Sequence, residues 1–512
     1  MLKNLNDQHS WKESLAAAKH RQVLNMLLLG FSAGLPILLI FSSLSLWMGE
    51  AGIEKSAVTY FSWAALGYSF KFVWAPLVDC LPIPLLTRLL GLRRSWLLVS
   101  QIGVILAITL MASSNPAVES DLLYMAMGAV MLGFSSATQD ITIDAYRIEA
   151  ASADLQGMMT ASYVAGYRIS MIVAGAGVLY LASYLGTSTE NYRYEAWKTT
   201  YHIMSFCMSV GIFITLMMKE PINRVKSHAF QTQDYLRLVI VFIISVTAFI
   251  ACFWFTKDIV GSLKAYFNNA NLSGFLIEVI RLIVAGGFAF WAAKLAVTLN
   301  VVDRKVVEVS YISPLKNFFE NYSMRTAWLL LALIGLYRVS DIVLGVISNI
   351  FYQDMGFTKN EIADAVKVFG VIMTIVGAFL GGVLAMRIGV MRVLFAGALM
   401  VVLTNLLFIL LVYSGHNLHV LYFVVAADNL VAGIASAGFI AFLSSLVDVR
   451  FTAMQYAMFS SLMTLIPKLL AGYSGSIVDS LGYTSFFIIA SCIGLPVLIL
   501  VYLANKSLKI RT

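Results

Sequence analysis

Charged residues are scarce in this sequence: Asp, Glu, Lys and Arg make up 12% of its 512 residues, whereas 60% of the residues are hydrophobic. The mean hydropathy of +0.84 is far above that of a soluble domain of this length. The formal net charge of +8 does not indicate nucleic-acid binding, because the basic residues lie in short loops and at both ends. Most of the chain is therefore expected to lie in lipid.

Cysteine and histidine are also rare, with four and six residues. The cysteines lie far apart in apolar sequence without CxxC spacing, which excludes a disulfide framework and a zinc site of the usual pattern. His416 and His419 come nearest to a ligand pair, but their loop offers no convincing third ligand. We expect no metal and no cofactor.

What the sequence does contain is a series of apolar stretches of about 20 residues, the length of a membrane-spanning helix. Backbone polar groups in hydrocarbon must be satisfied within the chain, and these stretches lack the alternation of barrel strands. We therefore predict an all-α membrane protein with fourteen spans. They are expected at residues 23–48, 57–78, 96–113, 121–146, 157–185, 199–218, 235–256, 275–299, 326–352, 362–386, 390–413, 419–446, 452–478 and 483–504.

The distribution of basic residues predicts the orientation of these spans. Most lysines and arginines lie in the N-terminal tail, in the loops after even-numbered spans and in the C-terminal tail. The opposite loops hold only Lys55, Arg193, Lys198, Lys257, Lys264 and Lys359. Because basic loops stay on the cytoplasmic side, both termini are expected in the cytoplasm.

The spans are expected to form two six-helix halves with two additional central helices between them, the arrangement of a major facilitator-type transporter. A polar segment leads into the last six spans. The predicted boundaries are a cytoplasmic N-tail at 1–22, an N-terminal half at 23–218, an intercalated helix pair at 219–300, a cytoplasmic linker at 301–325, a C-terminal half at 326–504 and a cytoplasmic C-tail at 505–512.

Basic residues inside the predicted spans are the strongest candidates for a binding site, because a charge in hydrocarbon needs a partner or water. Arg168 and Arg338 both fall near the middle of a span, and Lys71 lies about 12 Å from the cytoplasmic end of its span. Lys468 follows Pro467 in the thirteenth span. Arginine binds carboxylates through a fixed fork, so these residues suit an anionic substrate. Structural ion pairs are the alternative.

Acidic residues inside the spans are candidates for proton coupling. Asp140 and Asp144 are four residues apart on one face of a helix, where two carboxylates can share or relay a proton. Asp341 follows Arg338 by three residues and could neutralise it, and Asp428 interrupts the twelfth span near mid-depth. An ion pair with Arg147 is the structural alternative, above all for Asp144.

Uncharged polar and aromatic residues close to these charges complete the predicted binding site. They are Gln139, Tyr167, Tyr337 and Asn429. Flat aromatic faces could stack on sugar rings, although packing explains any single aromatic residue equally well.

Several segments resemble the AmpG-type muropeptide permeases of the major facilitator superfamily. They are FSAGLP at 31–36, YSFKFVWAPLVD at 68–79, GLRRSW at 91–96, SSATQDITIDAY at 135–146, GYR at 166–168, LYRVSD at 336–341 and FTAMQYA at 451–457. These segments occur in order in both predicted halves.

The resemblance implies proton-driven import of anhydromuropeptides, the GlcNAc-anhydroMurNAc-peptides released from the cell wall. Their transport from periplasm to cytoplasm serves peptidoglycan recycling and signals to β-lactamase induction. The resemblance places the protein in the bacterial inner membrane, where we expect a multi-pass monomer with substrate and protons as its ligands and no nucleic-acid partner.

The resemblance also implies a cytoplasmic latch. The superfamily carries Asp and Arg between its second and third helices, which correspond to Asp79, Arg93 and Arg94. The matching positions in the second half are Arg387 and Arg392. A long insert between Asp79 and Gly91 departs from the superfamily pattern.

Two alternatives remain open from the sequence. Acetyl-CoA transporters share a Gln-Asp-x-x-x-Asp pattern like that at Gln139 to Asp144, so acetyl-CoA or another anionic metabolite is the second candidate substrate. A membrane-embedded enzyme acting on lipid-linked cell-wall intermediates is the other. The sequence does not favour it, because no cluster of carboxylates or histidines lies at one loop face.

Overall fold

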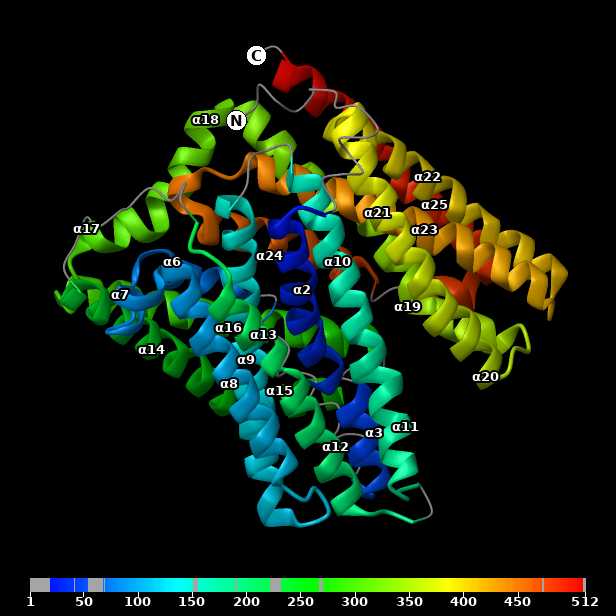
Figure 1. The fold of residues 1–512 in the computed structure, drawn as a ribbon, viewed down its shortest axis with the longest axis horizontal. Helices are drawn as coiled ribbons and strands as arrows, with labels where there is room; N and C mark the ends of the chain where they lie inside the picture. Colours follow the sequence, from blue (N-terminus) through cyan, green and yellow to red (C-terminus); the bar gives the residue numbers. More distant parts are fainter. Residues whose placement is uncertain are drawn as a thin grey trace. The chain divides into compact units, whose positions relative to one another are not determined.

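The computed structural model describes residues 19–40, 42–53, 68, 70–150, 155–188, 191–221, 232–266, 270–471 and 474–509. The regular elements within these ranges are all helical (Figure 1). Twelve helices among them are long and apolar enough to cross a membrane, which confirms the all-α membrane architecture. The expected spans at 57–78 and 452–478 include residues outside the described ranges, so the count of fourteen stays a prediction.

The helices before residue 219 are called the N-terminal group. They are α2 (Arg21–Ile40), α3 (Ser42–Glu50), the 3-10 helix η4 (Lys71–Val73), α6 (Ala75–Cys80), α7 (Leu86–Leu90), α8 (Leu92–Ala112), α9 (Glu119–Ala150), α10 (Gln156–Ile172), the π-helix η6 (Val173–Gly177), α11 (Val178–Tyr184), α12 (Tyr194–Cys207) and α13 (Ser209–Met217).

The middle of the chain contains α14 (Thr232–Phe255), α15 (Lys257–Tyr266), α16 (Ala270–Thr298), α17 (Arg304–Val307) and the π-helix η7 (Glu308–Ile312). The remaining helices are called the C-terminal group. They are α18 (Ser313–Leu336), α19 (Val339–Asp354), α20 (Lys359–Ile362), the π-helix η8 (Ala363–Phe369), α21 (Gly370–Ile388), α22 (Val390–Ser414), α23 (Leu418–Leu446), the 3-10 helix η9 (Val449–Phe451), α24 (Thr452–Ala471) and α25 (Ser474–Lys509).

The chain divides into two compact units. The main unit comprises Met1–Ala75, Ile83–Val225 and Phe318–Thr512, so it holds most of both helix groups. The second unit comprises Pro76–Pro82 and Lys226–Asn317. The predicted intercalated pair therefore falls largely into a unit of its own, and this unit extends through most of the predicted linker.

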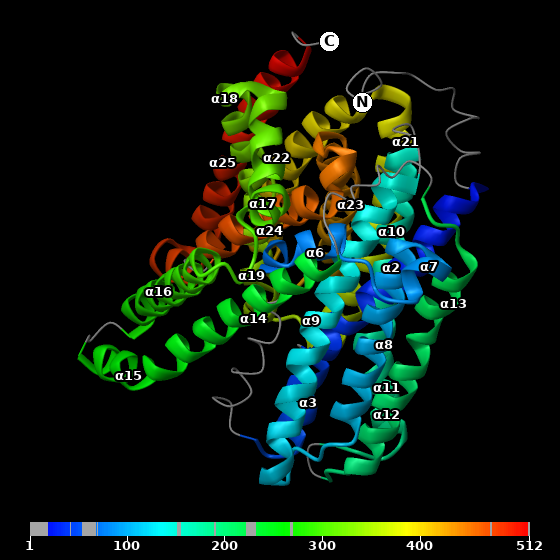
Figure 2. The ribbon, with the colours of Figure 1, turned by 90° about the vertical axis from the view of Figure 1, so that its left-hand side faces the viewer.

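Within the second unit, α14 and α16 lie side by side (Figure 2). The Arg281 guanidinium lies 3.9 Å from the centre of the Phe253 ring. Its Nε donates to the Thr256 hydroxyl over 3.1 Å, and a terminal nitrogen donates to the Phe253 carbonyl. Arg281 thus satisfies a main-chain acceptor at the end of α14, where a cation also suits the helix dipole.

In the main unit, α2 and α10 pack closely because glycine allows their main chains to touch. A Cβ atom on Gly30 would overlap the main chain of Tyr163, and one on Gly166 would overlap the main chain of Leu27. Small residues permit such helix contacts in membranes. The contact fixes α10, and with it the side chains of Tyr163, Tyr167 and Arg168.

The hydrophobic cores differ between the two ends of the main unit. We call the end at which α2 begins and α25 ends the terminal end. There the two groups share cores: Ile148 joins Leu443, and Met158 joins Met386. At the opposite end one core contains only N-terminal residues and another only C-terminal residues. Apolar packing therefore joins the two groups at the terminal end.

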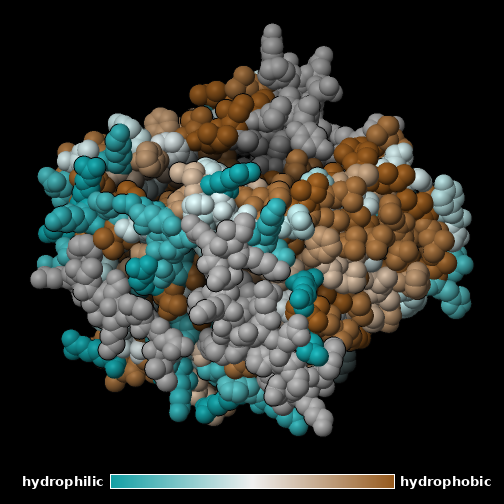
Figure 3. Space-filling view, turned by 90° about the horizontal axis from the view of Figure 1, so that it is seen from above, coloured by the Kyte–Doolittle hydropathy of each residue, from teal (hydrophilic) through white to brown (hydrophobic). Residues whose placement is uncertain are grey.

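Many large apolar side chains remain exposed, including Leu403 and Leu410 on α22 and Ile499 on α25. Hydrophobic residues correspondingly cover a broad area on the right of Figure 3. Such an area would be unfavourable in water but is the surface that a bilayer requires.

Two expected spans are interrupted at candidate site residues. Lys71 begins η4, and a turn at Trp74 separates η4 from α6. In the expected ninth span, α18 ends at Leu336 and α19 begins at Val339, so Arg338 lies in a turn. The expected span at 326–352 therefore contains a turn at Tyr337 and Arg338.

Candidate functional site

The N-terminal group contains a buried charge cluster around Asp140 on α9. Lys71 Nζ lies 2.8 Å from Asp140 Oδ2 and 3.7 Å from Asp144 Oδ2. The Tyr163 hydroxyl donates to Asp140 Oδ1 over 2.8 Å. Lys71 is only 4% exposed, so its charge is compensated by these carboxylates and not by water. The cluster joins η4, α9 and α10.

The helix period explains the two carboxylates, and the break at Lys71 explains their shared cation. Asp140 and Asp144 are one turn apart on α9 and therefore face the same neighbour. Asp144 Oδ1 also accepts a hydrogen bond from Arg147 over 3.2 Å. The two acids and two basic residues, Lys71, Asp140, Asp144 and Arg147, thus form one buried network. Each charge lies next to an opposite charge, which offsets the cost of burying it in a low-dielectric site.

The basic candidate Arg168 lies on α10, just beyond this network. Its guanidinium interacts electrostatically with Tyr167, with Arg338 and with Asp341. Among the described residues it makes no ion pair with a carboxylate, and it donates a hydrogen bond to the Met171 sulfur over 3.7 Å. A half-buried arginine without a carboxylate partner is available to an anionic ligand.

In the C-terminal group, Arg338 pairs with Asp341 over 2.7 Å, and each side chain is 28% exposed. Arg338 acts on Arg168, which belongs to the N-terminal group, as a like charge and therefore repels it. Arg338 and Asp341 thus form an ion pair, and this pair is more exposed than the network around Asp140.

Asp428 on α23 differs from the other acids. It makes no hydrogen bond or ion pair with any residue that the structure describes, and it interacts electrostatically with Asp341 and Tyr352. The adjacent Asn429 accepts a hydrogen bond from the Thr374 hydroxyl over 3.1 Å and donates to the Val425 carbonyl over 3.0 Å. Asn429 therefore links α23 to α21.

At the terminal end, Arg93 joins α8 to α9 and α24. Its Nε and one terminal nitrogen donate to the two oxygens of Glu149 over 3.0 and 2.5 Å, a bidentate ion pair that is almost fully buried. Thr452, at the start of α24, donates to the same carboxylate and accepts from Arg93 over 3.3 Å. The Arg93–Glu149 ion pair, which lies within the N-terminal group, therefore also binds the start of α24 in the C-terminal group.

Glu220 fixes the start of α8, on which Arg93 lies. Its two oxygens accept the main-chain N–H groups of Arg93 and Arg94 over 2.9 and 3.1 Å. This satisfies free donors at the positive end of the helix. Gly91 has φ 90° and no room for a Cβ beside Glu220, so this turn requires glycine.

The other predicted latch residues are more dispersed. Arg94 donates to the Thr215 and Leu216 carbonyls over 2.9 and 2.6 Å, which caps the end of α13. Arg387 lies in the last turn of α21, and Arg392 is exposed on α22. Asp79 belongs to the second unit, so its pairing with Arg93 stays a prediction.

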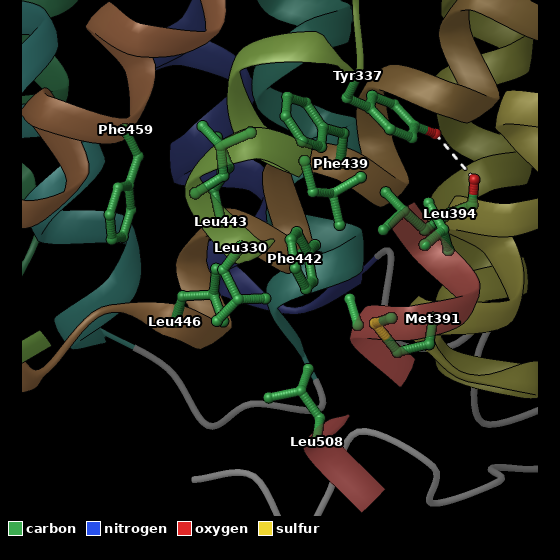
Figure 4. Close-up of a cluster of buried hydrophobic side chains, with 14 of the residues drawn as sticks. Leu330, Tyr337, Met391, Leu394, Phe439, Phe442, Leu443, Leu446, Phe459 and Leu508 are labelled. Atoms are coloured by element: carbon green, nitrogen blue, oxygen red, sulfur yellow. Dashed lines mark hydrogen bonds between the residues drawn. The ribbon is translucent and has the colours of Figure 1, made fainter. Parts of the chain in front are cut away.

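Two predicted binding residues are engaged in packing in this conformation. Gln139 is fully buried and donates to the Ser32 hydroxyl over 3.1 Å. Tyr337 stacks on Phe439 with ring centres 4.3 Å apart, and its hydroxyl donates to the Leu394 carbonyl (Figure 4). The side chain of Lys468 lies outside the described residues.

Three residues at the terminal end were not predicted from the sequence: Glu149, Glu220 and Thr452. Each lies near a predicted helix end, where a polar residue needs no special explanation. A carboxylate two residues after Arg147 was the available signal for Glu149, but only the tertiary structure places Arg93 beside it.

At the opposite end of the C-terminal group, His416 Nε2 lies 3.1 Å from the Glu361 carboxylate. The Thr358 main-chain N–H and the hydrogen bond with His416 hold the pKa of Glu361 below its usual value. No group of three or more potential metal ligands occurs in the part of the chain that the structure describes.

The chain is similar to known proteins over nearly its whole length. No protein-family model matches the sequence. The AmpG 4 protein of Rickettsia felis is 28% identical over 493 residues, which is 96% of this chain and 98% of the relative. The anhydromuropeptide permease of Escherichia coli K12 is 26% identical over 485 residues, 94% of this chain and 80% of the relative.

This chain is a homologue of the AmpG-type permeases. Solved structures agree with that conclusion at the level of fold. The outward conformation of the major facilitator transporter FucP matches with a TM-score of 0.58 and 12% identity, covering 95% of this chain and 99% of FucP. The proton:xylose symporter XylE matches with a TM-score of 0.56 and 11% identity, covering 96% and 95%. The fold is therefore that of a major facilitator transporter.

Proposed function

We propose that this protein is a proton-coupled importer of anhydromuropeptides in the bacterial inner membrane. The observation that carries the proposal is Arg168, which makes no ion pair with a carboxylate among the described residues, while Arg338 and Asp341 act on its charge from the other helix group. A cation without its own counter-ion is unfavourable in a membrane protein, and an anion from a ligand relieves this cost. The carboxylates of a muropeptide peptide supply that anion.

The identity of the substrate rests on the E. coli relative, whose name states anhydromuropeptide transport and whose similarity spans 94% of this chain. The sugars of such a ligand are uncharged, so they need hydrogen bonds and flat apolar faces instead of further cations. Tyr167 lies next to Arg168 in the sequence and interacts with it electrostatically. It is the aromatic residue best placed for a sugar ring.

Import requires a conformation that is open to the periplasm and closed to the cytoplasm. Both termini are expected in the cytoplasm, so the terminal end is the cytoplasmic end in this proposal. The shared cores and the contact of Glu149 with Thr452 close that end. This conformation would receive substrate from the periplasm.

Asp140 is the proposed coupling carboxylate. Its neighbours Lys71, Asp144 and Tyr163 can redistribute hydrogen bonds when its charge changes. A proton-coupling group must be stable in both its charged and its neutral form. Lys71 can pair with Asp140 when Asp140 is ionised and with Asp144 when Asp140 is neutral. Asp341 and Asp428 are the other acids considered for the role.

The test is uptake of labelled anhydro-disaccharide-peptide by proteoliposomes with an alkaline lumen. We expect accumulation of unmodified ligand, its abolition by a protonophore and poor competition by acetyl-CoA. Chemical change of the recovered ligand would instead indicate an enzyme. Accumulation of acetyl-CoA in place of the muropeptide would contradict the proposed substrate and favour the second candidate function.

A further inference from the structure

Arg147 in the last turn of α9 connects the acidic pair to the C-terminal helices. It is fully buried, and it donates to Asp144 over 3.2 Å and to Thr160 on α10 over 3.1 Å. The same nitrogen that reaches Thr160 also donates to Ser444 on α23 over 2.6 Å. The guanidinium lies 5.1 Å from the centre of the Tyr456 ring on α24.

These contacts extend the network around Asp140 into an unbroken series. Tyr163 and Lys71 hold Asp140, Lys71 reaches Asp144, and Asp144 accepts from Arg147. Arg147 then reaches the C-terminal group through Ser444. The Ser444 hydroxyl donates to its own helix, to the Ile440 carbonyl over 2.7 Å, so its oxygen is oriented to accept from Arg147.

The charges of this series balance when both acids are ionised: Lys71 and Arg147 face Asp140 and Asp144. A single proton on Asp140 leaves two cations to share one carboxylate. An uncompensated charge in a low-dielectric interior is costly, and the cost falls if one cation moves away. Arg147 can do so only by giving up its contacts with α23 and α24.

We propose that Arg147 is the positioning residue that makes closure of the terminal end depend on the charge of the Asp140–Asp144 pair. Binding of one proton by the pair weakens the hold of Arg147 on Ser444 and favours separation of α9 from α23 and α24. The proposal rests on the proton coupling proposed above, but not on the identity of the transported molecule.

Other titratable groups face the same pair, and each belongs to an element packed around it. The groups that interact with Asp140 or Asp144 are Tyr68, Lys71, Arg147, Tyr163, Tyr167 and Tyr456. Neutral tyrosine hydroxyls can orient the carboxylates but cannot replace a lost negative charge. Lys71 and Arg147 are therefore the groups that respond to a change in net charge.

The conformation of the terminal end provides a test that needs no substrate. Spin labels are placed at Lys219→Cys and Arg325→Cys, both exposed positions, after the native cysteines have been replaced by serine. Distances are measured in lipid from pH 5 to pH 8. For the otherwise unchanged protein we expect the population with separated labels to grow as the pH falls, by up to about tenfold per pH unit for a one-proton equilibrium.

Three variants separate the roles of charge and contact. Ser444→Ala removes the C-terminal acceptor but keeps the charges. It should enlarge the population with separated labels at every pH, and that population should still grow as the pH falls. Arg147→Gln should lose that response, because neutralising the pair then leaves no excess cation. Arg450→Gln is the matched control: this exposed arginine pairs with Asp448 next to the same helices and should leave the response unchanged.

Failure of the proposal has a definite signature. A pH response in Arg147→Gln equal to that of the parent, or no pH response in the parent, would overturn it. If Arg147→Gln does not fold, Ser444→Ala decides: unchanged distances in that variant contradict the proposed contact. A normal pH response without muropeptide uptake would instead count against the proposed substrate alone.

Discussion

The acids of the N-terminal and C-terminal groups differ in how their charges are compensated. Asp140 contacts both Lys71 and Tyr163, and Lys71 in turn reaches Asp144. In the C-terminal group, Asp341 pairs with Arg338 in a partly exposed turn, whereas Asp428 has no ion pair or hydrogen bond among the described residues. One group contains a connected buried network and the other a looser set of charges.

In the proposed mechanism, this difference favours separate tasks for the buried network around Asp140 and for the two arginines. In a connected network, a change of one charge alters every neighbouring contact, as coupling to a conformational change requires. A partly exposed arginine can exchange its carboxylate partner for that of a ligand. We therefore assign coupling mainly to the N-terminal network and anion binding to Arg168 and Arg338.

The largest expected effect is on stability. Lys71→Met leaves Asp140 without its cation and should lower the free energy of unfolding by about 3–5 kcal/mol, the cost of breaking a buried ion pair. Arg338→Met removes a more exposed pair and should cost about 1 kcal/mol or less. Thermal unfolding in detergent measures both. Adding Asp140→Asn to Lys71→Met should restore part of the loss.

Equal losses in the Lys71 and Arg338 variants would contradict the distinction between a connected and a loose set of charges. The distinction would also be contradicted if the double variant Lys71→Met, Asp140→Asn were no more stable than Lys71→Met. In that case, removing the unpaired charge of Asp140 would not have stabilised the protein.

The next effect is on ligand affinity. Arg168→Gln and Arg338→Gln should each remove a charge-assisted hydrogen bond, worth about 1.5–3 kcal/mol or about 10- to 150-fold in Kd. Binding of anhydromuropeptide in detergent measures this. Lys367→Gln provides a control in a membrane helix, because Lys367 is exposed on η8. Unchanged affinity in both folded arginine variants would refute their role as ligand contacts.

A smaller effect is expected at Asp428. Asp428 makes no contact with Lys71, Asp140 or Asp144 among the described residues, so its charge is not linked to the network to which we assign coupling. Asp428→Asn should therefore retain pH-driven accumulation in proteoliposomes. If accumulation is lost while substrate exchange persists, the coupling proton belongs to the C-terminal group and our assignment is reversed.

The smallest effect is expected from deleting the helix pair of the second unit, with a loop joining about Lys226 to Lys316. This pair carries its own internal contacts, such as Arg281 with Phe253. Transport should remain measurable in proteoliposomes. A folded deletion variant that binds substrate normally but cannot transport it would show that the pair has a mechanical role.

The sequence predicted contacts within a helix better than contacts between helices. Long apolar runs specify helices in lipid because no other open structure satisfies the backbone there. Spacing along one helix likewise predicted that Asp140 and Asp144 share a face. Arg338 and Asp341 are three residues apart and pair across the start of α19. These relationships are local, so one sequence contains them.

Contacts between distant segments were not predictable in the same way. Lys71 was considered as a ligand for substrate, and only the fold brings it beside Asp140. Tyr337 had the same aromatic signal as Tyr167, yet it packs on Phe439. The turn at Tyr337 and Arg338 contains neither glycine nor proline, the residues that indicate a turn in a sequence. Which side of a helix meets which neighbour is decided by packing of the whole bundle.

Proton movement driven by substrate tests the central assignment most directly. Anhydromuropeptide is added outside lightly buffered proteoliposomes while the external pH and the counterflow of labelled substrate are recorded. We expect external alkalinisation with the unmodified protein. Asp140→Asn should retain binding and counterflow but show no alkalinisation. Substrate-driven alkalinisation by Asp140→Asn at the unmodified protein's rate would contradict the account and leave Asp341 and Asp428 as the acids to test.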